Sequence, residues 1–169
     1  MPTLLRRPVA LLAALLFAII FIAGCAHSTG ATSKIDRDNS VWTGRLSLQV
    51  HSEPPQAFFA GFELKGSSEQ GELTLNSPLG NSLAVLRWSP QEAVLDSGNQ
   101  IQRFASVDEL IENVTGAAIP LPALFDWLGG KNTSVGGWSA DLSQQSAGRI
   151  SASRATPQPR TDLRIVLAQ

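Results

Sequence analysis

Residues 42–50 read Trp-Thr-Gly-Arg-Leu-Ser-Leu-Gln-Val, and their side chains alternate between apolar or small and polar. This period of two is typical of a β-strand in an antiparallel sheet that buries one face and leaves the other in water. Pro54 and Pro55 end the pattern, and it resumes over residues 58–65. The two stretches therefore predict a pair of antiparallel strands that begins a mainly β domain.

The alternation continues outward along the chain in shorter runs, which are separated by residues typical of turns. A third strand is predicted around Leu73 and Leu75. The remaining predicted strands are Ser82–Trp88, Ala93–Leu95, Ile101–Phe104, Trp138–Leu142, Ile150–Ala155 and Leu163–Leu167. The spacing of the first six strands is that of an antiparallel meander.

Two short amphipathic helices are predicted between the sixth and seventh strands. Ser106 and Glu109 have the spacing of a capping box, and the apolar residues after them form one stripe that stops at Gly116. A second helix is predicted to start near Pro120 or Pro122 and to end at the next pair of glycines. Helices inserted into such a meander are expected to pack over the concave side of a curved sheet.

The space between the sheet and these helices has two alternative contents. Side chains can fill it as an ordinary core, or it can stay partly open as a cavity for an apolar ligand, as in small barrels. Both arrangements produce the same apolar stripes, so periodicity leaves both alternatives open.

The amino-terminal segment has the pattern of an export signal. Arg6 and Arg7 precede fifteen apolar residues, and the run ends at Ile22-Ala23-Gly24-Cys25, which resembles a bacterial lipobox. An uncleaved membrane helix is the alternative, but a span needs roughly 20 residues. We therefore expect residues 1–24 to be a lipoprotein signal peptide and Cys25 to be lipidated.

The chain after the lipobox divides into a tether and one domain. Residues 25–40 are mostly small or polar, which predicts a lipidated amino terminus and a flexible tether. Residues 41–169 are predicted to form a single domain, because removing 24 of 169 residues leaves room for one hydrophobic core. Ala26 follows the cysteine where an aspartate would resemble an inner-membrane retention signal, so the outer membrane is the expected address.

Composition excludes several classes of function. Arg6 and Arg7, two of the 13 basic residues, lie in the signal against 14 acidic residues elsewhere, so the exported chain is net acidic and nucleic acid is not expected as a partner. Cys25 is the only cysteine, which excludes a disulfide within the domain and thiolate metal sites. His27 and His51 are the only histidines, and we expect His51 to face solvent at a strand end. We predict a binding protein with no catalytic residue, metal or cofactor.

One strand connection has an unusual composition. Pro78 restricts its backbone, Gly80 permits a left-handed turn, and Leu79 stands where polar residues are expected. A leucine folded back on the sheet and a leucine that touches a membrane are both compatible with this composition. Burial of one leucine contributes roughly 1.5–3 kcal/mol, which suffices for brief contact with a bilayer.

Several segments together resemble the LolB family of outer-membrane lipoprotein receptors. The similarity extends from Trp42-Thr43-Gly44-Arg45-Leu46 to Leu163-Arg164-Ile165, and its most specific parts are Asn76-Ser77-Pro78-Leu79-Gly80, Thr115-Gly116, Ile119-Pro120-Leu121, Leu124 and Trp127-Leu128-Gly129. The resemblance implies an incomplete, half-closed antiparallel β-barrel with a short helical lid over an apolar cavity. The region after Lys131 is shorter than in the enterobacterial members, which leaves missing late strands and a less closed cavity as an expected consequence.

The resemblance also implies a function without covalent chemistry. A monomeric receptor on the periplasmic face of the outer membrane would accept lipoproteins from a soluble LolA-like periplasmic carrier, bind their acyl chains, and release them into the inner leaflet. Pro78, Leu79 and Gly80 match the family's protruding loop, and Leu79 its membrane-inserting leucine. A structural or assembly lipoprotein with a filled core is the alternative function.

The residues expected to line the cavity follow from alternation along the predicted elements. On the sheet side they are Trp42, Leu46, Leu48, Phe62, Leu73, Leu75, Leu86 and Trp88. On the lid side they are Leu124 and Leu128.

Overall fold

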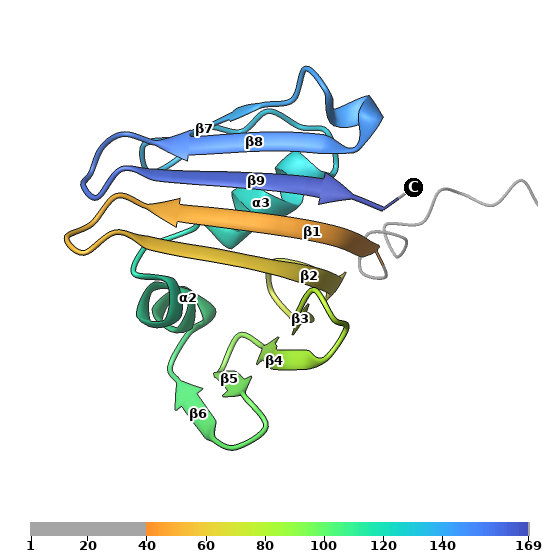
Figure 1. Ribbon diagram of the computed structural model, residues 1–169, viewed down its shortest axis with the longest axis vertical. Helices are drawn as coiled ribbons and strands as arrows, with labels where there is room; N and C mark the ends of the chain where they lie inside the picture. The colour runs from red at the N-terminus through yellow and green to blue at the C-terminus, as the bar shows by residue number, and fades with distance from the viewer. Residues whose placement is uncertain (1–39, 169) are drawn as a thin grey trace, which may run out of the picture. The chain divides into compact units, whose positions relative to one another are not determined.

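The computed structural model describes residues 40–168, which form one antiparallel sheet and two α-helices (Figure 1). The strands are β1 (Val41–Val50), β2 (Gln56–Gly66), β3 (Gly71–Asn76), β4 (Ser82–Trp88), β5 (Ala93–Asp96), β6 (Ile101–Phe104), β7 (Trp138–Asp141), β8 (Arg149–Arg154) and β9 (Thr161–Leu167). The helices are α2 (Val107–Thr115) and α3 (Leu121–Leu128), and a short 3₁₀ turn, η2, covers Gln145–Ala147.

The sheet has the order β6-β5-β4-β3-β2-β1-β9-β8-β7, and every neighbouring pair is antiparallel. The first six strands form a meander, as predicted, and the last strand returns to the first, with Leu48 opposite Leu163. Because β6 and β7 lie at opposite edges, the sheet does not close into a barrel. The predicted mainly β, incomplete barrel is thereby confirmed.

The helices lie on one face of this sheet, which is the concave face, and α2 packs against β5 and β6. The pairing places Leu48 opposite Phe58 and Leu46 opposite Ala60, so the apolar residues of β1 and β2 share the concave face. The polar and charged residues between them face outward, and the exposed Arg45 is an example. Alternation therefore predicts correctly which face is buried.

Both predicted helices are present, and their ends show why. The Ser106 hydroxyl accepts a hydrogen bond from the Glu109 amide at 3.2 Å, as a capping box requires. The Glu109 carboxylate reaches one residue further back than this motif predicts and accepts from the Ala105 amide at 3.0 Å. Gly116 ends α2 with a φ of 70°, a left-handed conformation that favours glycine.

Three strands follow Lys131, and they are the three that alternation predicts in this region. The predicted signal peptide, Cys25 and the tether up to residue 39 lie outside the described residues. Within residues 40–168, no helix is both long and apolar enough to cross a membrane.

Candidate functional site: an apolar cavity under a helical lid

A cavity of about 530 Å³ lies between the concave face of the sheet and the two helices. Its volume falls within the roughly 300–1,000 Å³ of known ligand pockets. Among the described residues that line it, only Gln56, Ser97 and Thr115 are polar, and none is charged. The cavity is therefore suited to a ligand that is itself apolar and needs few hydrogen bonds.

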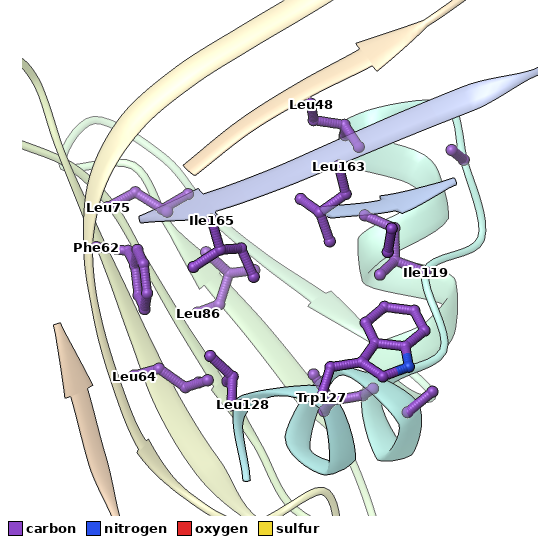
Figure 2. Close-up of a cluster of buried hydrophobic side chains, with 14 of the residues drawn as sticks. Leu48, Phe62, Leu64, Leu75, Leu86, Ile119, Trp127, Leu128, Leu163 and Ile165 are labelled. Carbon is purple, nitrogen blue, oxygen red and sulfur yellow. The ribbon is translucent and has the colours of Figure 1, made fainter. Parts of the chain in front are cut away.

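Nine of the ten residues predicted to line the cavity are found around it. They are Leu46, Leu48, Phe62, Leu73, Leu75, Leu86 and Trp88 on the sheet and Leu124 and Leu128 on α3. Figure 2 shows Phe62 and Leu86 from the sheet on the same side of the view as Leu128 from the lid.

Trp42, the tenth predicted residue, is not among the residues that line the cavity. Its ring packs edge-on against Phe125 of α3, with 5.3 Å between ring centroids. Trp88 approaches the same phenylalanine from β4 at 6.5 Å. The aromatic contacts fill this part of the interface between the sheet and the lid, so Trp42 supports α3 rather than facing open space.

The sequence did not identify the lining residues of the last strand. Leu163 and Ile165 contribute to the cavity because β9 pairs with β1 in the middle of the sheet. Val107 and Ile111 of α2 also line it. The apolar stripe of α2 was recognisable, but the part of the sheet that it covers depends on contacts between distant segments.

The linker between the two helices is attached to the sheet by two buried side chains. The Ala118 carbonyl accepts hydrogen bonds from the Trp138 indole at 2.9 Å and from the Arg154 guanidinium at 3.2 Å. Arg154 is only 5% exposed, and its guanidinium lies 5.7 Å from the centre of the Trp138 ring. It also donates to the Pro159 carbonyl. These contacts hold the lid in place over the cavity.

The carboxyl-terminal end of α3 is held by a second set of polar contacts. The Thr133 hydroxyl donates to the Asp126 carboxylate at 2.6 Å, and the Lys131 ammonium group donates at 3.1 Å. The hydrogen bond from Thr133 and the nearby charge of Lys131 hold the pKa of Asp126 below its usual range. The buried Trp127 indole donates to the Thr133 carbonyl at 2.8 Å, so the same loop is fixed twice.

The mouth of the cavity is marked by the lining residues that are exposed to solvent. These lie at the start of β2, at Leu83 at the start of β4, at Ser97 after β5, and at Val114 in the last turn of α2. Phe58 of β2 is 37% exposed at this position. The cavity is therefore open to solvent where these residues lie.

The β3–β4 loop projects its leucine into solvent. Leu79 is 89% exposed, which excludes a side chain folded back on the sheet. The Ser77 amide donates to the Asn81 carbonyl at 2.8 Å, and the Gly80 amide donates to the Ser77 carbonyl at 2.9 Å. Gly80 has a φ of 85°, which suits this tight turn. The loop thus holds Leu79 outward through its own backbone hydrogen bonds.

His51 lies at the end of β1, as predicted, and its side chain is about half exposed. Its Nε2 atom is 2.8 Å from the Asp162 carboxylate, which also pairs with Arg160. This cluster contains no residue that lines the cavity, and it does not include Leu79. Among residues 40–168, no three His, Cys, Asp or Glu side chains are grouped as metal ligands would be.

Comparison with known proteins identifies the family of this arrangement. The family model described as "Outer membrane lipoprotein LolB" matches residues 40–159, which is most of the chain and nearly all of the sheet. The chain belongs to the LolB family. The matched residues include β1 to β8 and both helices, and they leave out β9, which contributes Leu163 and Ile165 to the cavity.

Curated LolB proteins align over most of the chain. The protein named outer-membrane lipoprotein LolB of Cupriavidus necator is 32% identical over 139 residues, which cover 79% of this chain and 69% of that protein. The LolB protein of Cupriavidus pinatubonensis is 33% identical over 156 residues, or 89% of this chain and 73% of that protein. The LolB protein of Bordetella petrii is 27% identical over 173 residues, or 88% and 87%.

Proposed function

We propose that this protein is an outer-membrane lipoprotein that receives other lipoproteins from a LolA-like periplasmic carrier and delivers them to the inner leaflet of that membrane. Membership of the LolB family supports the role in lipoprotein localisation. The observation that supports the mechanism best is the apolar cavity of about 530 Å³ beneath the lid. In this proposal the cavity holds the acyl chains of the transported lipoprotein, which we call the cargo.

The physical basis of the transfer is a gradient of affinity. Acyl chains gain similar hydrophobic free energy in an apolar cavity and in a bilayer. The receptor must therefore bind cargo more tightly than the carrier does and less tightly than the membrane does. No bond is made or broken in such a transfer, so the proposal needs no catalytic residue, metal or cofactor.

Two further features have roles in this proposal. The predicted lipid at Cys25 would keep the protein at the receiving membrane, as the lipobox suggests. The exposed Leu79 would enter the interfacial region of the bilayer during release, because burial of a leucine is favourable by roughly 1.5–3 kcal/mol. Pro78 and Gly80 would shape the loop that presents it.

A blocked cavity tests the proposal. Ala84 lines the cavity from β4, whereas its neighbour Val85 points to the opposite face of the sheet. Ala84→Trp should weaken binding of a fluorescent fatty acid about tenfold, since losing roughly two buried methylene groups costs about 1.6 kcal/mol. Val85→Trp is the matched control and should bind as the wild type does.

The measurement uses unlipidated chain, residues 25–169 with Cys25→Ala, titrated with the fluorescent fatty acid. A wild-type chain that does not bind the probe would favour the alternative of a structural lipoprotein without lipid cargo. Equal affinities of the Ala84→Trp and Val85→Trp variants would show that the probe binds elsewhere. In a second step, carrier loaded with a lipoprotein is mixed with each variant, and only Ala84→Trp should fail to accept the cargo.

A further inference from the structure

Half of β2 lacks a neighbour on one side. The whole strand, Gln56–Gly66, pairs with β1, but β3 pairs only with residues 61–66. Among residues 40–168, no other strand pairs with the free side of residues 56–60. Figure 1 shows β3 beside the carboxyl-terminal half of β2 only. The sheet therefore contains an open edge in its middle, in addition to the edges at β6 and β7.

The backbone groups at this open edge can be identified from the hydrogen bonds of the strand. The Gly66 amide donates to the Ser40 carbonyl at 3.3 Å, on the side of β1. Successive residues of a strand direct their N–H and C=O groups to opposite sides, and the pairing of β2 has no bulge. Even-numbered residues of β2 thus face β1. Ala57 and Phe59 consequently direct two N–H and two C=O groups to the open side.

The composition of this segment does not protect the edge. Residues 56–60 read Gln-Ala-Phe-Phe-Ala and contain no charge and no proline. Sheet proteins usually guard an exposed edge with a charged side chain, a proline or a bulge. Phe59 is 60% exposed beside this edge, and Ala57 is exposed as well. The segment has the features of a strand that is completed by another chain.

The open edge is continuous with the mouth of the cavity. Gln56, Ala57 and Phe58 all line the cavity, and all three are exposed to solvent. The side chain of Ala57 belongs to the outer face of the sheet, because it pairs with Gln49 rather than with a concave residue. Its atoms can line the cavity only if the cavity reaches the backbone edge of β2. A ligand that leaves the mouth would meet unpaired backbone groups at once.

We propose that the edge at Ala57 and Phe59 binds the polypeptide of the cargo as an added β-strand. The extended segment directly after the acylated amino terminus would pair with β2 while the acyl chains occupy the cavity. Addition of a strand to a free edge is a common mode of peptide recognition, in which main-chain hydrogen bonds supply the affinity. This inference rests on the proposed function, because the acyl chains bring the segment to the edge.

Among the possible occupants of this edge, the cargo polypeptide is favoured because it is covalently joined to the acyl chains. A peptide joined to acyl chains in the cavity begins at the mouth, where the unpaired groups lie. Recognition through the backbone does not depend on sequence, so one receptor could hold cargo proteins with unrelated amino termini. It would also distinguish an acylated polypeptide from a phospholipid, which has the same chains but no peptide groups.

The test compares three probes on unlipidated chain, residues 25–169 with Cys25→Ala. The first probe is a diacylated cysteine followed by a short peptide, the second is the same lipopeptide with N-methylated backbone amides, and the third is the fluorescent fatty acid. The lipopeptide should bind the wild type about tenfold more tightly than its N-methylated form, because two or more net backbone hydrogen bonds are lost. The affinity for the fatty acid should not change when the edge is altered.

Substitutions at the edge provide a matched pair. Phe59→Pro removes an N–H group that has no partner in the sheet and should abolish the advantage of the lipopeptide. Phe59→Ala keeps the N–H group and should retain the advantage. Equal binding of the fatty acid by both variants shows that Phe59→Pro has kept the fold, and the N-methylated probe tests the same hydrogen bonds on unmodified protein.

Hydrogen exchange of the Ala57 and Phe59 amides reports on the pairing directly. Both amides should become protected with the lipopeptide and stay unprotected with the fatty acid. Equal affinities for the two lipopeptides would overturn the added strand and leave the acyl-binding cavity intact. A failure to bind the fatty acid would instead overturn the proposed function. Protection of these amides without ligand that disappears when residues 26–39 are deleted would assign the edge to the tether. Protection without ligand that rises with protein concentration would assign it to a second copy of the chain.

Discussion

A substitution of Leu79, the exposed leucine of the β3–β4 loop, best separates the binding of cargo from its delivery to the membrane. Leu79 is 89% exposed and makes no part of the cavity wall, so Leu79→Glu should change the free energy of unfolding by no more than about 0.5 kcal/mol. If the leucine enters the bilayer interface during release, its loss removes roughly 1.5–3 kcal/mol from the membrane-engaged state. The population of that state should fall about ten- to hundredfold.

Single-turnover transfer to liposomes measures this effect. Unlipidated receptor is loaded with a fluorescent lipoprotein and mixed with vesicles, and the rate of transfer is followed. Leu79→Glu should bind cargo as the wild type does but release it to vesicles at least about tenfold more slowly. Ile101→Glu is the matched control, because Ile101 is 61% exposed on β6 and not in the β3–β4 loop. Equal transfer rates for Leu79→Glu and the wild type would refute the role of the loop.

Three further predictions concern the lid and the anchor. Arg154→Ala should lower the free energy of unfolding by about 2 kcal/mol, because it removes the hydrogen bonds to the Ala118 and Pro159 carbonyls. Arg164→Ala is the control, because Arg164 is exposed, and it should not lower stability. Equal midpoints of urea unfolding for the two variants would contradict this contribution. Because the pKa of Asp126 is lowered in the folded chain, its contribution to stability is complete above the pKa of the unfolded chain and is lost as the pH falls through the folded value. Asp126→Asn should therefore make the free energy of unfolding fall less steeply with decreasing pH. An unchanged dependence of stability on pH in acid would argue against this contribution. A chain exported by a soluble signal with Cys25→Ala should keep its affinity for acyl chains and lose its restriction to one membrane, and loss of binding would show that the anchor belongs to the binding site.

Local patterns predicted the elements of this fold well. The strict alternation of residues 42–50 predicted both the strand and its buried face, because period two is a property of the backbone. The capping residues Ser106 and Gly116 marked the ends of α2, because a capping hydrogen bond and a left-handed turn are also local properties of the chain. Neither prediction depends on what the strand or the helix packs against.

The parts that the sequence did not reveal depend on distant contacts. Alternation indicated that β9 has an apolar face, but the order of the strands decides that Leu163 lines the cavity. Trp42 lies on the predicted face, but its ring packs edge-on against Phe125 of α3 and it is not among the lining residues. Arg154 is charged and buried, and no local pattern predicts that a carbonyl between two helices needs it as a partner.

The place of β9 between β1 and β8 has a consequence for biogenesis. Of the nine described strands, β1 leaves the export channel first, yet one of its two partners is β9, which emerges last of the nine. Before that moment the nascent sheet lacks the strand that joins its two parts, and β7 and β8 have no connection to the meander through backbone pairing. The pairing of β1 with β9 must therefore wait until β9 has emerged, and contacts of such long range form slowly. A chain cut short before Thr161 would lose the junction of two half-sheets, so quality control in the periplasm should recognise it as unfolded.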